Sequence, residues 1–213
     1  MIGVTEFPDE LEQVVYSILD EEVPRSTVFH GRQHTQRVFQ AARTLAEKEA
    51  LSEADQLLTL TAALLHDIGY RETRVNHERI SADFGHEILP DFGYSLAQVD
   101  RIHALILLTA TRSTTSRASA GDNKASESLS EQILLDACWE YFGAEDRLEQ
   151  IELLYKEEFH NGLVTDRIRF YQKLVAQITV HTYFTKTAHA VWQPNKMSLK
   201  LWLERELQHL SLG

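Results

Sequence analysis

Histidine and aspartate stand side by side at His66-Asp67, directly after the apolar run from Leu57 to Leu65. His34 precedes this pair and Asp136 follows it, each near the start of its own apolar-periodic segment. Imidazole nitrogens and carboxylate oxygens bind divalent cations, and an all-helical protein must collect them from several helices, because no single helix can surround an ion. Burying Asp67 unpaired would be costly, and either a divalent cation or a plain arginine salt bridge would remove that cost. We expect these four side chains to converge on one divalent ion.

The only cysteine, Cys138, lies two residues after Asp136. Side chains two residues apart point to different faces of a helix, so we do not expect Cys138 to join the same ion. The expected ligands are then nitrogen and oxygen atoms, a set that suits Mn, Fe, Co, Ni, Zn or Mg. A single cysteine also excludes an internal disulfide and fits a reducing compartment.

The segments that carry these residues repeat their apolar side chains at helical spacing. Ser52 and Asp55 resemble a capping pair that opens the helix leading to His66, and Gly69 stands where a helix end favours a left-handed residue. Because no alternating apolar–polar strand pattern appears, we expect an all-α fold, a bundle of eight to nine helices in one domain over residues 1–213. The expected helices are residues 9–20, 33–50, 57–65, 77–89, 96–110, 131–142, 144–159, 165–184 and 197–210.

Composition and charge limit the partners. A net charge of −11 argues against a nucleic-acid polymer, whose nonspecific binding depends on basic groups. No lysine or arginine precedes Arg25, so the basic region of a signal peptide is missing, and the apolar stretches are too short to span a bilayer. We expect a cytoplasmic protein with no membrane partner. The sequence leaves open whether it forms a homo-oligomer.

The order His34, His66-Asp67, Asp136 resembles the H…HD…D signature of the HD-domain metal-dependent phosphohydrolase superfamily. The local sequences agree, with HTQRV at His34, ALLHDIGY at His66 and LLDACWEYFG at Asp136. FHGRQH is similar to a segment shared by cyclic-nucleotide phosphodiesterases and a bacterial branch of HD phosphohydrolases, and the likeness runs from about Phe29 to near the C-terminus. The resemblance implies a metal-dependent hydrolase of a phosphate monoester or diester, with a nucleotide or other small phosphorylated molecule as substrate.

Two features depart from the superfamily pattern. His77 is a candidate ligand for a second metal, but Thr109 stands where a fourth histidine is expected. The DADL-like segment common after the last ligand reads Asp136-Ala137-Cys138-Trp139. The missing fourth histidine favours one tightly held metal ion, with a second ion bound weakly or not at all. The altered segment after Asp136 affects which substrate is expected, but not Asp136 as a ligand.

Further residues are assigned to catalysis through the resemblance. His30, four residues before His34, would protonate the leaving alkoxide while Asp67 holds the metal. The alternative is that His30 is a loop or helix-cap residue. The polar stretch of residues 111–130 is expected to be a mobile loop that covers the substrate.

Arginines near the signature residues are candidates for binding phosphate. Arg32 and Arg71 are the candidate phosphate contacts, Arg74 belongs to the same sequence cluster, and Arg112 begins the polar loop. The alternative for each is a solvated surface arginine. A phosphate substrate also predicts that no acidic side chain beyond Asp67 and Asp136 lines the site, and further acidic side chains there would favour a cationic substrate instead.

Two other functions remain compatible with the sequence. A di-iron HD-type oxygenase would need more histidine ligands, for which His86 and His103 are the nearby candidates. His86 lies nine residues after His77 and so on the opposite face of a helix, which argues against this function. A noncatalytic metal-binding ligand sensor would keep the ligand set without hydrolysis.

Overall fold

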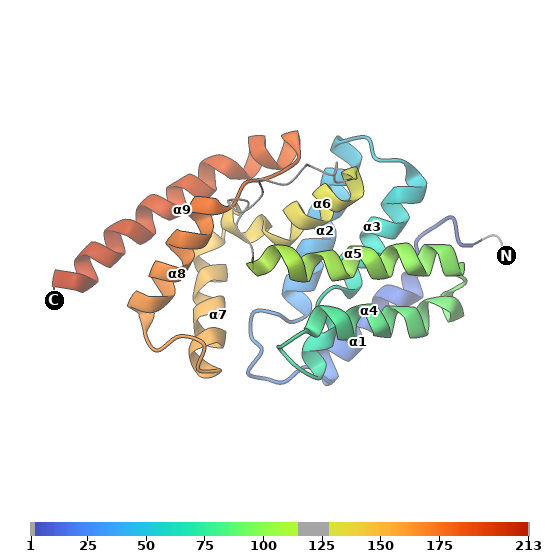
Figure 1. Cartoon of the computed structure of the whole chain (residues 1–213), viewed down its shortest axis with the longest axis horizontal. Coiled ribbons are helices and arrows are strands. Elements are labelled where there is room, and N and C mark those ends of the chain that lie inside the picture. The colour runs from blue at the N-terminus through green and yellow to red at the C-terminus, as the bar shows by residue number, and fades with distance from the viewer. Residues whose placement is uncertain (1–2, 115–127, 213) are drawn as a thin grey trace.

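The computed structural model describes residues 3–114 and 128–212, and in these residues it contains helices and no strand (Figure 1). The predicted all-α fold is therefore confirmed. The α-helices are α1 (Asp9–Glu21), α2 (Arg32–Lys48), α3 (Glu53–Leu65), α4 (His77–Ile88), α5 (Leu96–Thr114), α6 (Leu129–Cys138), α7 (Arg147–His160), α8 (Arg167–Val180) and α9 (Lys186–Leu212). Short 3-10 helices are η1 (Ile68–Arg71), η2 (Leu89–Phe92) and η4 (Glu140–Phe142).

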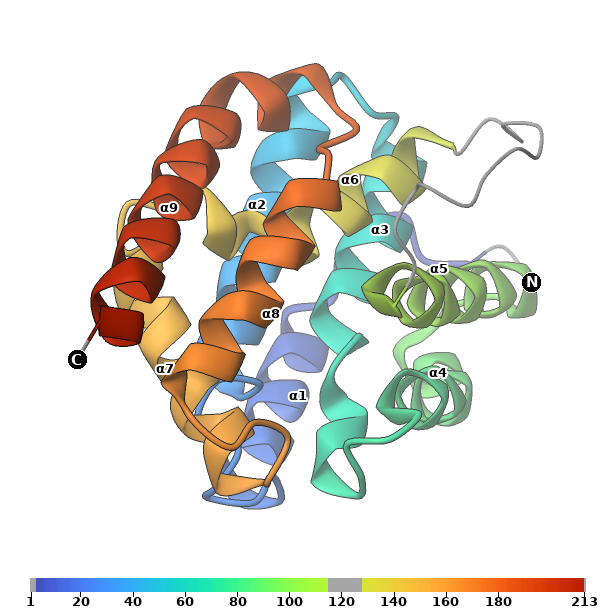
Figure 2. The ribbon, with the colours of Figure 1, turned by 60° about the vertical axis from the view of Figure 1, so that its left-hand side comes forward.

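The helices pack around two apolar cores. Side chains of α1 to α6 form the larger core, in which α2 and α3 pack against each other and against α6. A smaller core joins α7, α8 and α9 to Phe29 and to Tyr141 and Phe142 of η4. Figures 1 and 2 show α7, α8 and α9 gathered at one end of the molecule, beside the α1 to α6 bundle. Segments from both groups are therefore available to build a site between them.

Local signals explain where the site-bearing helices begin and how the chain turns after α3. The side chain of Ser52 accepts a hydrogen bond from the backbone N–H of Asp55, which confirms the predicted cap of α3. The left-handed prediction for Gly69 is wrong, since the left-handed glycines of the described residues are Gly93 and Gly162. A Cβ atom on Gly69 would instead lie 2.1 Å from the carbonyl oxygen of His77. The missing side chain thus lets η1 pack directly against the start of α4.

Two predicted boundaries differ from the structure. Helix α5 extends to Thr114, so residues 111–114 of the predicted polar loop are helical, while residues 115–127 lie outside the described residues. Helix α9 begins at Lys186, well before the predicted start at Met197, and contains Pro194. Buried side chains pack into the cores on both sides of Pro194, for example Ala188 before it and Leu199 after it. The free energy gained from this packing outweighs the cost of the backbone hydrogen bond that proline removes.

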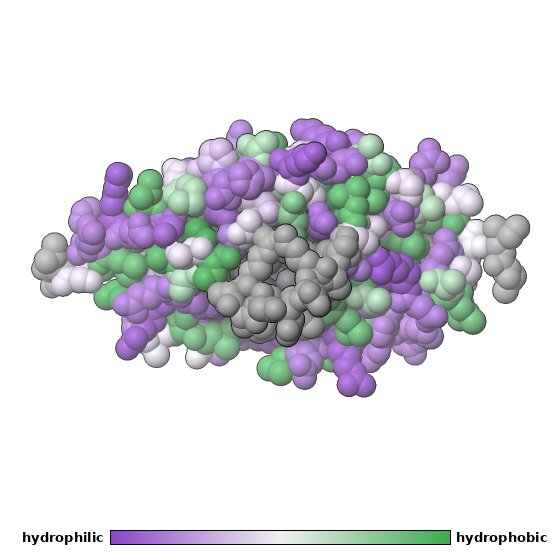
Figure 3. Space-filling view, turned by 45° about the horizontal axis from the view of Figure 1, so that its top comes forward, coloured by the Kyte–Doolittle hydropathy of each residue, from purple (hydrophilic) through white to green (hydrophobic). Residues whose placement is uncertain are grey.

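The surface is mixed in character. On the face shown in Figure 3, hydrophilic side chains alternate with small apolar patches. Among the helices that the structure describes, none has the length and hydrophobicity needed to cross a bilayer.

Candidate metal centre

Three of the four predicted ligands meet in the structure. His34 lies in the first turn of α2, and His66-Asp67 directly follow α3. All three side chains are buried, and one ligand atom of each lies within 4.8 Å of the others. Nε2 of His66 lies 3.1 Å from Oδ2 of Asp67, and Nε2 of His34 lies 3.5 Å from the same oxygen. The contact between α2 and α3 brings the three together.

Hydrogen bonding of His66 shows that this cluster suits a cation. Nδ1 of His66 lies 2.9 Å from the carbonyl oxygen of Ala63, and because a carbonyl oxygen only accepts, Nδ1 must carry the proton. A neutral His66 then directs the lone pair of Nε2 at a lone pair of Asp67. Two lone pairs 3.1 Å apart repel each other unless a proton or a metal ion lies between them. A backbone carbonyl that fixes the imidazole in this way is the usual support of a metal-binding histidine.

The charge states of the cluster also fit a divalent ion. Burial alone would raise the pKa of Asp67, but the neighbouring His66 and His77 outweigh it and hold the pKa well below its usual value. Burial lowers the pKa of His34 to about 3, so this imidazole is neutral and offers a lone pair. Imidazole nitrogens of His34 and His66 and carboxylate oxygens of Asp67 form a nitrogen and oxygen donor set for a divalent metal.

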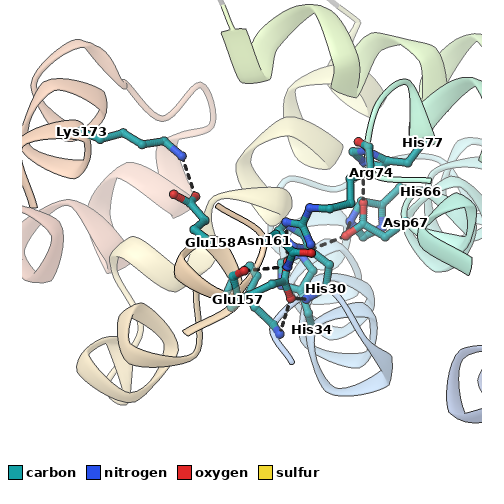
Figure 4. A network of polar contacts seen from close by, with 11 residues as sticks. His30, His34, His66, Asp67, Arg74, His77, Glu157, Glu158, Asn161 and Lys173 are labelled. Atoms are coloured by element: carbon teal, nitrogen blue, oxygen red, sulfur yellow. Dashed lines mark hydrogen bonds and ion pairs between the residues drawn. The ribbon is translucent and has the colours of Figure 1, made fainter. Parts of the chain in front are cut away.

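The second oxygen of Asp67 faces another histidine. Nε2 of His77 lies 3.2 Å from Oδ1 of Asp67, while Nδ1 of His77 donates to the carbonyl oxygen of Arg74 at 3.0 Å. Asp67 therefore stands between His77 on one side and His34 and His66 on the other (Figure 4). Thr109 lines the same cavity, but its hydroxyl donates to the carbonyl oxygen of Ile106 at 2.7 Å. A second ion beside His77 would thus have fewer protein ligands than the first.

Asp136, the predicted fourth ligand, is not brought to this cluster. Its Oδ1 accepts from the backbone N–H of Phe184 at 2.8 Å, and its Oδ2 accepts from the backbone N–H and the hydroxyl of Thr185, both at 2.8 Å. Burial raises the pKa of Asp136 to about 6, although these hydrogen bonds oppose the rise. The carboxylate therefore fastens the segment before α9 to α6. Cys138 lines the cavity instead, and burial raises the pKa of its thiol.

The cluster lies at one end of a cavity of about 370 Å³. Aromatic side chains form much of its wall: Phe29, Tyr70, Trp139 and Tyr141. Polar side chains from α7 and α8 also line the cavity: Glu158, Lys173 and Gln177, which we call the distal wall. Figure 4 shows Glu158 and Lys173 on the opposite side of the site from His66 and Asp67. A small molecule in the cavity would contact both the cluster and the distal wall.

His30 lines the cavity and is held by a carboxylate that the sequence did not reveal. Nδ1 of His30 lies 2.5 Å from Oε1 of Glu157 on α7, and Oε2 of Glu157 accepts from the backbone N–H groups of Phe29 at 2.7 Å and His30 at 3.1 Å. Burial would raise the pKa of Glu157, but these hydrogen bonds and the charge of His30 lower it to about 2. The ring of His30 also stacks on Tyr70, with centroids 4.4 Å apart. Glu157 thereby fixes the proton on Nδ1 and leaves Nε2 free for the substrate.

The predicted arginine contacts are mostly not found at the cavity. Arg32 pairs with Asp20 at 2.5 Å, and Arg71 lies 3.3 Å from both Glu22 and Glu72. Neither lines the cavity. Arg32 fits the solvated surface alternative, whereas the side chain of Arg71 is only 18% exposed and its Nε is buried without a hydrogen-bond partner.

Arg74 does not line the cavity either, but it contacts the carboxylate that holds His30. It donates to Oε1 of Glu157 at 2.9 Å, while its Nε and Nη1 are buried without a hydrogen-bond partner (Figure 4). The side chain of Arg112 lies outside the described residues.

The expectation that no further acidic side chain lines the site is wrong. Glu78 and Glu158 line the cavity together with Asp67, and Lys173 is the cationic side chain that accompanies them. Lys173 balances Glu158, with Nζ 2.6 Å from Oε1. Three carboxylates against one ammonium would repel a phosphate, so a divalent cation is needed before the cavity can attract one.

Comparison with known proteins agrees with this arrangement. The HD domain model matches residues 31–140, a range that includes His34, His66-Asp67 and Asp136. No curated protein gives a significant match. A structure described as a predicted HD superfamily hydrolase from an uncultured Thermotogales bacterium is 19% identical, has a TM-score of 0.58, and covers 94% of this chain and 91% of its own. A Lactobacillus plantarum structure is also 19% identical, with a TM-score of 0.67 and coverage of 98% and 100%. At these identities the two structures show that the fold is shared.

Proposed function

The chain belongs to the HD domain family, and from this premise we propose that it is a metal-dependent phosphohydrolase, which cleaves a phosphate monoester or diester of a small molecule such as a nucleotide. The observation that carries the proposal is the buried cluster of His34, His66 and Asp67, in which Nε2 of His66 lies 3.1 Å from Oδ2 of Asp67. That arrangement is stable with a cation between the two atoms.

The residues around the cluster would have different roles in phosphoryl transfer. A divalent ion, when bound, supplies positive charge to a phosphoryl oxygen and lowers the pKa of water. Glu157 orients His30 so that a proton on Nε2 passes to the leaving oxygen. Arg74 donates a hydrogen bond to Oε1 of Glu157 at 2.9 Å and so helps to hold the carboxylate that orients His30. The aromatic walls of the cavity exclude bulk water from these groups.

The di-iron oxygenase alternative finds no support in the positions of the extra histidines. His86 and His103 do not line the cavity, and both are partly exposed on α4 and α5. Nε2 of His86 lies 3.6 Å from Asp100, and Nε2 of His103 lies 3.5 Å from Asp83. These rings belong to surface ion pairs.

Metal analysis followed by an ester screen tests the proposal. The purified protein should bind a divalent metal, and with added Mn²⁺, Mg²⁺ or Ni²⁺ it should hydrolyse members of a panel of alkyl phosphates, nucleotides and p-nitrophenyl phosphate. His30→Ala should keep the metal and lose roughly 10²–10⁴-fold in turnover of an alkyl ester. The loss should be smaller for p-nitrophenyl phosphate, whose leaving group departs without a proton.

Ligand and surface variants complete the test. Asp67→Ala should release the metal and abolish both activities, whereas His103→Ala should change neither. Equal losses on both substrates for a metal-bound His30→Ala would make His30 a phosphate-positioning residue. Absence of hydrolysis by the metal-loaded wild type across the panel would overturn the proposal in favour of a metal-binding sensor.

A further inference from the structure

We propose that the distal wall (Glu158, Lys173 and Gln177) binds the leaving group of the substrate and selects one that carries hydroxyl groups, as in a sugar phosphate or a nucleoside monophosphate. This inference rests on the proposed phosphohydrolase function and adds the chemical class of the substrate. The three residues are specificity-determining, and none of them belongs to the metal-binding cluster or to the proton donor.

The distal wall is formed by two neighbouring helices. Glu158 lies one turn after Leu154 on α7, and Gln177 lies one turn after Lys173 on α8, so each pair shares one helix face. All four side chains line the cavity. Figure 4 shows Lys173 and Glu158 on the opposite side of the site from His66, Asp67 and His77.

One carboxylate oxygen of Glu158 lacks a hydrogen-bond donor. Its Oε1 accepts from Nζ of Lys173 at 2.6 Å, but its Oε2 is buried and has no hydrogen-bond partner. The residue is only 5% exposed, so solvent does not replace the missing donor. A buried polar atom without a partner is uncommon and costly, which makes a donor supplied by a ligand the natural complement.

The neighbours of Glu158 offer the matching donors. An ammonium group carries three N–H donors, and Lys173 uses one of them on Glu158. The side-chain amide of Gln177, which can both donate and accept, has no hydrogen bond to another described residue. Hydroxyl groups donate and accept at once, so adjacent hydroxyls of a sugar satisfy an acceptor and its neighbouring donors together. An unsubstituted alkyl group would leave the buried Oε2 of Glu158 without a donor.

The position of the proton donor places the leaving group against this wall. Glu157, which holds His30, and Glu158 are consecutive residues of α7. His30 and Glu158 both line the cavity, so a group whose leaving oxygen is protonated by His30 can extend within the cavity to Glu158. A volume of about 370 Å³ is near the lower end of ligand-binding cavities, which fits a small monomeric substrate.

Matched substrates test the inference. The specificity constant kcat/KM of the metal-loaded enzyme should be higher for ribose 5-phosphate than for pentyl phosphate, which has a similar length and no hydroxyl. Glu158→Gln keeps the shape of the side chain and should reduce this preference by about 10- to 100-fold, the value of one hydrogen bond to a charged group. The loss for p-nitrophenyl phosphate, whose leaving group carries no hydroxyl, should be smaller than the loss for ribose 5-phosphate. Gln177→Leu, at a partly exposed position, should also lower the preference and does not disturb the ion pair.

The control and the contrary outcomes separate this inference from the proposed function. Glu152 also lies on α7 but pairs with Arg167 away from the cavity lining. Glu152→Gln should therefore leave the ratios of kcat/KM between the three substrates unchanged. Equal losses on all three substrates for Glu158→Gln and Gln177→Leu would mean that the wall is structural and would overturn the inference. A wild type that hydrolyses the esters without preferring ribose 5-phosphate would also overturn it and leave the proposed function intact. A wild type that hydrolyses no ester would refute the proposed function itself.

Discussion

Replacing Glu157 by glutamine should destabilise the fold by an amount that depends on pH. The side chain is fully buried and accepts hydrogen bonds from Phe29, His30 and Arg74. Burial would raise its pKa, but His30 and the backbone donors lower it from 4.5 to about 2. At about 1.4 kcal/mol per pKa unit, this shift contributes on the order of 3 kcal/mol to the free energy of unfolding at neutral pH. Because the folded pKa lies below the unfolded one, the contribution is complete above about pH 5 and is lost as the pH falls toward 2.

Urea unfolding measures this contribution directly. At pH 7, with a chelator present so that metal release adds nothing, Glu157→Gln should lower the free energy of unfolding by about 3 kcal/mol, or Tm by roughly 6–12 °C for a chain of this size. The difference from wild type should narrow between pH 5 and pH 3. Glu152→Gln on the same helix loses only an exposed ion pair with Arg167 and should cost less than about 1 kcal/mol. A difference that is below 1 kcal/mol at pH 7, or that does not narrow with acid, would refute the reasoning.

Three further variants test other parts of the structure. Asp136→Asn should keep the metal-to-protein ratio in elemental analysis and lower Tm, because the carboxylate accepts three hydrogen bonds from Phe184 and Thr185; loss of metal at unchanged Tm would make it a ligand. Burial lowers the pKa of Lys196 to about 8, so between about pH 8 and pH 10.5 the unfolded wild type binds more protons than the folded one. The free energy of unfolding of the wild type should therefore rise with pH in that range, and Lys196→Met should abolish this rise. If urea unfolding shows that the free energy of unfolding changes equally with pH in the wild type and in Lys196→Met, the prediction is contradicted. The double variant His86→Ala/His103→Ala should retain metal and ester hydrolysis, and a loss of bound iron would instead favour the oxygenase.

Local signals in the sequence predicted the helices and the candidate ligands His34, His66 and Asp67, whose side chains cluster in the structure. The cap at Ser52 and the apolar run to Leu65 depend on neighbouring residues, so they could be recognised without the fold. His66 and Asp67 stand at the end of that run, where polar side chains need a buried partner. The order of histidines and aspartates supplied His34 as well. These features are encoded within single segments of the chain.

Contacts between distant segments could not be predicted in the same way. Glu157 reaches His30 from 127 residues away, and nothing near Glu157 distinguishes it from the other acidic residues of α7. The arginines show the same limit. Arg32 and Arg71 are closer in sequence to the signature residues, yet they pair with acids outside the cavity, while Arg74 pairs with Glu157 of α7. Which arginine contacts Glu157 depends on how α7 packs against the other helices, and that is a property of the whole fold.

Asp136 and Cys138 show how the fold decides between two candidates on one helix. At about 100° per residue they lie on nearly opposite faces of α6, so only one can point toward His34 and His66. A carboxylate is the expected ligand, which favoured Asp136, but the segment before α9 passes beside α6 and engages that carboxylate with the backbone of Phe184 and Thr185. Cys138 is thereby left at the cavity, with a thiol whose pKa burial raises. The cluster that remains carries a single negative charge, so a divalent ion held there keeps a net positive charge, which is what an approaching phosphate requires in a cavity that also contains Glu78 and Glu158.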